Sequence, residues 1–116
     1  MRLTITESHF TTKEQALAEI AGLGWHAIEK TFSAENEFHW HDFDAVAYVL
    51  EGTASAELED GTVERAAVGC RVAAPAGIVH RNVGPDWYGI VAFSVHPSQL
   101  TQPLNKPVAS RPAVPR

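Results

Sequence analysis

The sequence predicts an all-β domain, a small barrel or sandwich, preceded by one short helix. Two observations carry this prediction. Residues 25–96 consist of many short segments with the apolar patterns of β-strands, and turn residues separate them. Apolar residues at helical spacing stand out only near the N-terminus. Glycines recur between the predicted strands, where tight turns are expected, at Gly52, Gly61, Gly69, Gly77 and Gly84.

The strands are assigned from alternating and continuous apolar patterns. Residues 45–50 are nearly all apolar, as expected of a strand that is buried on both faces. Asp60-Gly61 supplies the positive φ of a hairpin turn between two alternating segments. The predicted strands are residues 25–32, 45–50, 54–58, 62–67, the residues around Val72, 78–83 and 87–95.

A short helix is predicted in the N-terminal segment, residues 1–24. Thr11-Thr12-Lys13-Glu14 resembles a capping box, and Leu17, Ile20 and Ala21 follow at helical spacing. Gly22 is the expected end of the helix. We expect this helix to dock on the β-domain.

The C-terminal tail, residues 97–116, differs in composition from the β-domain of residues 25–96. It holds five of the seven prolines and shows no periodicity. Because proline fixes φ and lacks a backbone N–H, we expect an extended tail.

The composition and charge fit one domain that does not bind nucleic acid. The chain has 116 residues. Residues 1–96 carry 14 acidic and 6 basic residues (−8), whereas residues 97–116 carry three basic ones (+3). An acidic body argues against a phosphate backbone as partner. No apolar run is long enough to span a bilayer, and no signal-peptide pattern is present. The lone Cys70 cannot form an internal disulfide, so we expect a cytoplasmic protein.

A possible metal site begins with the stretch EFHWHDFDAVAYVLEG, residues 37–52. Side chains two apart on a strand project to the same face, so His39 and His41 can share one small ion. A second stretch, GCRVAAPAGIVH, places His80 just after a tight turn at Pro75 and Gly77. In a closed or nearly closed β-structure, His80 can converge on the other two histidines.

In this order, the two stretches resemble the two motifs of the cupin family. The first family motif is Gly, five residues, His-x-His, three or four residues, Glu, six residues and Gly. The second is Gly, five residues, Pro-x-Gly, two residues, His, three residues and Asn. The matching residues are His39, His41 and Gly52 for the first motif, and Gly69, Pro75, Gly77 and His80 for the second. The match spans residues 39–80, and the flanking strands extend it over 25–96.

The resemblance implies a small cupin, a jelly-roll-like β-barrel, in which His39, His41 and His80 bind one divalent metal ion. It also favours a homodimer. Imidazole ligands suit a transition metal (Fe, Mn, Ni, Co, Cu or Zn) and not Ca or Mg. Such a site keeps open positions for a small molecule.

Three positions depart from the family motifs. Ser33 and Gly84 replace the initial Gly and the final Asn, and Ala45 replaces the metal-binding Glu. Asp44 stands one residue before Ala45 and faces away if strand alternation is unbroken, whereas a bulge would turn it toward the metal. We expect the unbroken geometry, with three histidine ligands; a supporting contact from Asp44 to a ligand histidine is a third alternative.

Other residues have weaker claims to a role. Ala45, Ala47 and Val49 are expected to face inward. Some aromatic side chains are expected either to line the pocket or to fill the core: Phe43, Tyr48, Trp87 and Phe93. The remaining histidines are expected at the surface or at an edge: His9, His26 and His96. Cys70 is expected to be a small buried filler. Arg81 is expected either to contact an acidic substrate or to form a surface ion pair.

Two functions remain open on the sequence. The first is a metal-dependent enzyme, a dioxygenase or an isomerase, acting on a small organic molecule. The second is a non-catalytic module that binds or senses a small ligand. All three histidines are present, which favours the enzyme.

Overall fold

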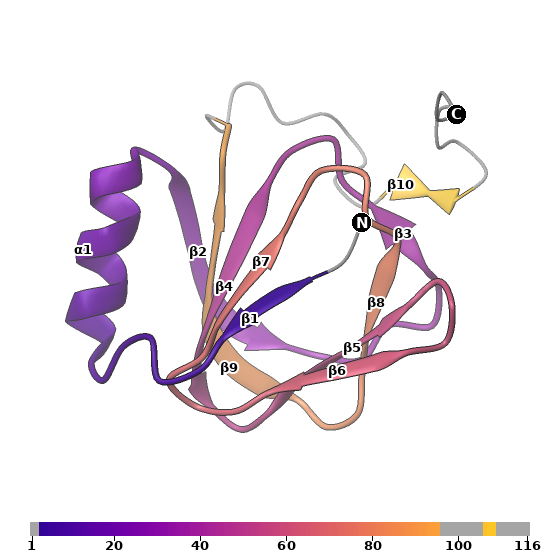
Figure 1. Cartoon of the computed structure of the whole chain (residues 1–116), viewed down its shortest axis with the longest axis horizontal. Helices are drawn as coiled ribbons and strands as arrows, with labels where there is room; N and C mark the ends of the chain where they lie inside the picture. Colours follow the sequence, from indigo (N-terminus) through magenta and orange to yellow (C-terminus); the bar gives the residue numbers. More distant parts are fainter. Residues whose placement is uncertain (1–2, 96–105, 109–116) are drawn as a thin grey trace.

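In the described part of the chain, two antiparallel sheets of five strands each make up the domain. The computed structural model describes residues 3–95 and 106–108. Sheet A has the strand order β1-β7-β4-β9-β2, and sheet B has the order β10-β3-β8-β5-β6 (Figure 1). The strands are β1 (Thr4–Thr6), β2 (His26–Phe32), β3 (His39–Trp40), β4 (Ala45–Glu51), β5 (Ala54–Leu58), β6 (Val63–Ala66), β7 (Arg71–Ala74), β8 (His80–Val83), β9 (Trp87–Phe93) and β10 (Lys106–Pro107). The prediction of an all-β fold with one N-terminal helix is confirmed.

The helix α1 (Lys13–Leu23) begins as the sequence predicts but ends later. Thr12 is the N-cap, and its side chain accepts a hydrogen bond from the backbone N–H of Gln15, whose side chain completes the capping box. The predicted end at Gly22 is wrong, because Gly24 takes the left-handed conformation (φ 72°) that closes the last turn. Among residues 3–95 and 106–108, no helix combines the length and the apolar character needed to cross a membrane.

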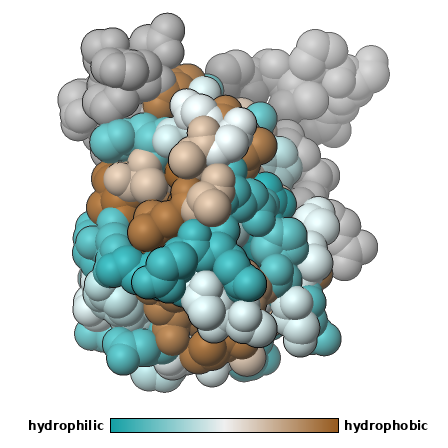
Figure 2. Space-filling view, turned by 90° about the vertical axis from the view of Figure 1, so that its left-hand side faces the viewer, coloured by the Kyte–Doolittle hydropathy of each residue, from teal (hydrophilic) through white to brown (hydrophobic). Residues whose placement is uncertain are grey.

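α1 packs against the outer face of sheet A. Ala16 and Ile20 are buried there against β4 and β9, together with Phe10 and Tyr48. Leu17, predicted to belong to the apolar face, is instead 40% exposed. Figure 2 views this side of the molecule and shows a hydrophobic patch beside a hydrophilic band.

The inner faces of the two sheets enclose a cavity. On β4, alternation sends Val46 and Tyr48 toward α1, whereas Ala45 and Ala47 face the opposite sheet, as predicted. The strand order pairs β3 with β8 in sheet B, although about 40 residues of the sequence separate them. The matching residues of the first motif begin on β3, and those of the second motif end on β8. The two motifs therefore meet at one end of the cavity.

Two short strands that the sequence analysis missed complete the sheets. β1 pairs with β7, and β10 pairs with β3. The Lys106 ammonium lies 3.8 Å from the Asp42 carboxylate and 6.0 Å from the centre of the Trp40 ring. Part of the tail is thus a strand; most of residues 97–116 lies outside the described residues.

Candidate metal centre

The three histidines of the two motifs converge. Each histidine offers one ring nitrogen as a ligand, and these three nitrogens lie within 4.8 Å of one another. The ring centres are 4.9 Å apart for His39 and His41, 4.6 Å for His39 and His80, and 5.3 Å for His41 and His80. In the described part of the chain, this is the one group of at least three potential metal-ligating side chains that is close enough to hold an ion.

Backbone pairing places the histidines. His39 and His80 are directly opposed in the antiparallel ladder between β3 and β8. His41 follows β3, and its carbonyl accepts a hydrogen bond from the N–H of Gly77 (2.8 Å). Gly77 has φ 87°, which favours glycine, so the Pro-x-Gly turn can fold back onto the first motif. Each motif therefore positions the histidine of the other.

Asp44 stabilises this turn and is not part of the histidine group. Its carboxylate accepts a hydrogen bond from the N–H of Ala76 (2.8 Å), while its backbone pairs with Ser94. β4 begins at Ala45, whose methyl group lines the cavity. This arrangement agrees with the unbroken geometry of three histidines, and no bulge turns Asp44 toward them.

Burial keeps two of the imidazoles neutral, as metal ligation requires. Burial lowers the pKa of His39 to about 4, and the neighbouring His80 acts in the same direction. Burial also lowers the pKa of His80, although the Ile78 carbonyl opposes this shift. That carbonyl lies 3.0 Å from Nδ1 of His80 and can only accept, so Nδ1 carries the proton and Nε2 keeps its lone pair.

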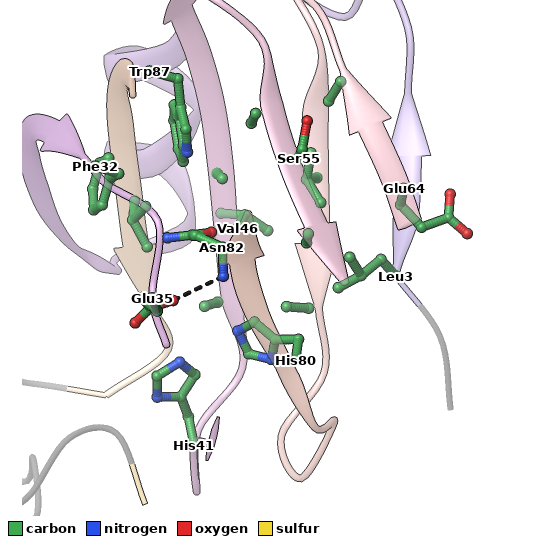
Figure 3. Close-up of a pocket in the computed structure, with 18 of the residues that line it drawn as sticks. Leu3, Phe32, Glu35, His41, Val46, Ser55, Glu64, His80, Asn82 and Trp87 are labelled. Atoms are coloured by element: carbon green, nitrogen blue, oxygen red, sulfur yellow. Dashed lines mark hydrogen bonds between the residues drawn. The ribbon is translucent and has the colours of Figure 1, made fainter. Parts of the chain in front are cut away.

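Glu35 is a site residue that the sequence analysis missed. Its Oε2 lies 3.6 Å from Nδ1 of His39, and its Oε1 accepts a hydrogen bond from the N–H of Asn82 (2.9 Å). Figure 3 shows the Glu35 carboxylate beside the histidines. The one sequence signal was an acidic residue four positions before His39, in the spacer that precedes the His-x-His pair.

Arg81 holds the loop that carries Glu35. Its guanidinium binds Oε1 of Glu57 through Nε (2.9 Å) and Nη2 (2.7 Å), and Nη1 donates to the carbonyl of Asn36 (2.6 Å). It also lies 4.5 Å from the centre of the Phe38 ring. Of the two expected roles, the ion pair is the one that the structure shows; Arg81 is not among the residues lining the cavity.

The cavity beside the histidines has a volume of about 260 Å³. Alanines from four strands form much of its wall: Ala45, Ala47, Ala54, Ala56, Ala66 and Ala74. Phe43, Trp87 and Phe93 also line it, as expected. Of the two roles expected for Tyr48, filling the core is the one that the structure shows: Tyr48 faces α1 and packs edge-on against Phe10, with 5.7 Å between ring centres.

The remaining candidates lie away from the cavity. His9 binds Glu19 (2.6 Å) near α1, and His26 contacts Phe93 (6.3 Å between ring centres) at the start of β2. His96 lies outside the described residues. Cys70 is buried beside Val49, which confirms that it is a core residue.

The histidine group fits a divalent transition-metal ion. A metal–nitrogen bond measures about 2.0–2.1 Å, so donors that share a tetrahedral ion lie about 3.4 Å from one another. From the observed spread of at most 4.8 Å, two ligand nitrogens must approach each other by up to about 1.5 Å, a movement that the two rings share. Three imidazoles, two of them kept neutral by burial and one with a fixed tautomer, form a suitable donor set.

Comparisons with known proteins identify the fold. No protein-family model and no curated protein matches the chain. The chain is similar to a crystal structure from Neisseria meningitidis (TM-score 0.55, 19% identity), over 63% of this chain and 75% of that one. It is also similar to a DUF861 family protein from Thermotoga maritima (TM-score 0.51, 22% identity), over 77% of this chain and 97% of that one. At these identities the likeness shows the fold alone, and that fold is cupin-like.

Proposed function

We propose that this protein binds one divalent transition-metal ion through His39, His41 and His80 and acts as a metal-dependent enzyme on a small organic molecule. The observation that carries the proposal is the convergence of the three imidazoles at one end of the cavity. A structural metal site would be closed by four protein ligands, whereas three ligands beside a cavity leave positions open.

The protein's own residues prepare this site. The backbone ladder fixes the relative positions of His39 and His80, and burial keeps both neutral. When bound, iron, manganese, nickel, cobalt, copper or zinc would supply Lewis-acid chemistry, and the redox-active metals also electron transfer. The alanine wall leaves room for an organic molecule and limits the water around it. Dioxygenase-like or isomerase-like reactions fit this arrangement.

A non-catalytic ligand-binding or sensing module is the second candidate. Ala45 favours it, because the family motif has a carboxylate at this position. The two candidates differ in one measurable respect. An enzyme converts a bound molecule in the presence of the metal, whereas a sensing module releases it unchanged.

Elemental analysis tests the metal proposal. We expect about one equivalent of metal per chain in protein purified without a chelator or an affinity tag. His80→Ala should abolish tight binding, because it removes one of three ligands. His26→Ala is the matched control, since His26 lies outside the group, and it should keep its metal. Equal metal content in the two variants would contradict the proposal.

The expected compartment is the cytoplasm, and the expected partner is a small molecule. Cys70 is a free, buried thiol, which fits a reducing environment. The acidic body disfavours nucleic acid as partner. Localisation of the tagged protein in intact cells tests the compartment directly.

A further inference from the structure

The indole N–H of Trp87 is a buried hydrogen-bond donor that has no acceptor among the described residues. Trp87 is 5% exposed and lines the cavity, and its Nε1 is buried without a partner. An indole nitrogen can only donate. Buried polar groups are nearly always paired, because leaving one unpaired is costly. An unpaired donor at a cavity wall therefore points to a ligand that supplies the acceptor.

Packing fixes the orientation of this donor. The Trp87 ring stacks on Phe32, with 4.6 Å between ring centres and 22° between planes. On the same strand, a Cβ at Gly89 would lie only 2.6 Å from Cζ3 of Trp87, so the absent side chain makes room for the ring. In Figure 3 the nitrogen-bearing edge of Trp87 faces the interior. The ring cannot turn this edge away without disturbing both contacts.

Trp87 and the histidines lie at opposite ends of the same cavity. In Figure 3, Trp87 is at one end and His41 and His80 are near the other. The wall between them is mainly apolar, with Ala47 and Val91 among the lining residues. Lys30 also lines the cavity, and its ammonium lies 5.2 Å from the centre of the Phe32 ring that stacks on Trp87. Lys30 is exposed, so its charge is screened by solvent, and the buried indole N–H itself is what calls for an acceptor at this end.

We propose that the cavity binds a small organic molecule with polar groups at both ends. Metal-binding donors lie at the histidines, an apolar chain or ring contacts the alanine wall, and a carboxylate or carbonyl oxygen accepts the hydrogen bond of Trp87 Nε1–H. This inference names the ligand class for the proposed function and rests on it. Trp87 is a specificity-determining residue in this scheme.

Chelating probes test the scheme on zinc-loaded protein. The probes are the monohydroxamic acids of succinic and glutaric acid, in which a hydroxamate binds zinc and a carboxylate ends the chain. Butyrohydroxamic and pentanohydroxamic acid are the matched controls, because a methyl group replaces that carboxylate. The readout is the NMR signal of the indole N–H groups in protein labelled with ¹⁵N-tryptophan. The signal that Trp87→Phe lacks belongs to Trp87. Trp25, which does not line the cavity, gives the reference signal.

We expect at least one carboxylate-ended probe to move the Trp87 indole proton downfield and to leave Trp25 unchanged. Trp87→Phe keeps the stacked ring but removes the donor, so it should bind that probe about tenfold more weakly. It should bind zinc and the methyl-ended probes as the wild type does, which also shows that the variant is folded.

Three kinds of result would overturn the inference, and they can be told apart. If the wild type binds neither zinc nor any other divalent transition metal, the proposed function fails and the inference fails with it. If zinc binds, but neither carboxylate-ended probe binds better than its control or the Trp87 signal does not move, the ligand class is wrong and the metal proposal stands. An equal loss of affinity for both kinds of probe in Trp87→Phe would show a merely structural role.

Discussion

The Asp44 carboxylate accepts a hydrogen bond from the N–H of Ala76 and does not face the histidines. Substitutions at Asp44 and at the neighbouring Ala45, where the family motif has its Glu, should therefore affect metal affinity differently. Asp44→Asn keeps an acceptor oxygen for Ala76, so we expect little change in metal affinity. Ala45→Glu places a carboxylate on the cavity face beside the histidines, so we expect tighter binding. Metal titration of the two apo variants measures both effects. A large loss in the first variant with no gain in the second would contradict the three-histidine geometry.

Glu35 is expected to support His39. Its Oε2 lies 3.6 Å from Nδ1 of His39, and its negative charge opposes the lowering of the His80 pKa by burial, so the carboxylate stands where it can support the ligand rings. Glu35→Gln keeps the shape and the acceptor for Asn82 but removes the charge. We expect metal affinity to fall about 10–100-fold.

Glu37→Gln is the control for this experiment. It removes the same charge from the same loop, and the Glu37 side chain does not line the cavity. Competition with a metal-binding dye measures both variants. Equal affinities in Glu35→Gln and the wild type would exclude the supporting role.

The stability of the metal-free protein should depend on pH through His39. Its pKa is about 4 in the folded chain and about 6.5 unfolded. Between these values the unfolded chain binds more protons, so stability is complete above pH 6.5 and falls as the pH drops toward 4. We expect a loss of about 2 kcal/mol between pH 7 and pH 5 from this group. Urea unfolding at both pH values measures the loss.

His39→Gln isolates the contribution of this residue, because other groups titrate over the same range. The variant cannot take up a proton at position 39 and should lose less stability between pH 7 and pH 5. The same pH dependence in the variant and the wild type would contradict the assignment.

At the scale of elements, the loop between β2 in sheet A and β3 in sheet B supports the metal centre. Arg81 on β8 binds the Asn36 carbonyl and contacts Phe38 in this loop, which also carries Glu35. We expect Arg81→Ala to lower the unfolding free energy by up to about 1 kcal/mol, because the side chain is partly exposed. Metal affinity should fall as well, since the loop positions Glu35 and His39.

Arg71→Ala is a matched control for the loop. Arg71 forms a comparable ion pair with Glu19 (2.9 Å), on the α1 side of the molecule. It should cost a similar free energy of unfolding and leave metal affinity unchanged. Denaturant unfolding and metal titration compare the two variants, and an equal effect on metal affinity would show that the loop contact has no special role.

The sequence predicted the elements whose pattern is local. The long strands β2, β4 and β9 were found because seven residues carry a readable apolar pattern. β1 and β10 were missed because segments of three and two residues have no pattern of their own and depend on the strands they pair with. The three histidines followed from their motifs, and Trp87 was named as a candidate for the pocket wall, whereas Glu35 and the unpaired indole donor of Trp87 needed the strand order that brings distant segments to one cavity.

At the scale of the whole molecule, we expect a symmetric homodimer. β1, β2, β6 and β10 are the outermost described strands of the two sheets, and unpaired strand edges favour association. Light scattering at micromolar concentration should give about 25 kDa, twice the 12.6 kDa of one chain. A mass of one chain at that concentration would refute this prediction.

The alanine wall makes the empty molecule less stable than its fold allows. A void in a protein core costs about 24 cal/mol per Å³. The cavity of about 260 Å³ therefore corresponds to at most about 6 kcal/mol, less where water enters it. The net stability of a domain is only about 5–15 kcal/mol. Larger side chains at Ala45 or Ala47 would recover part of this deficit and remove the space for a ligand. The small alanine side chains lower the stability of the empty protein and leave space for a ligand. An occupant that fills the cavity restores the packing that the alanines leave incomplete.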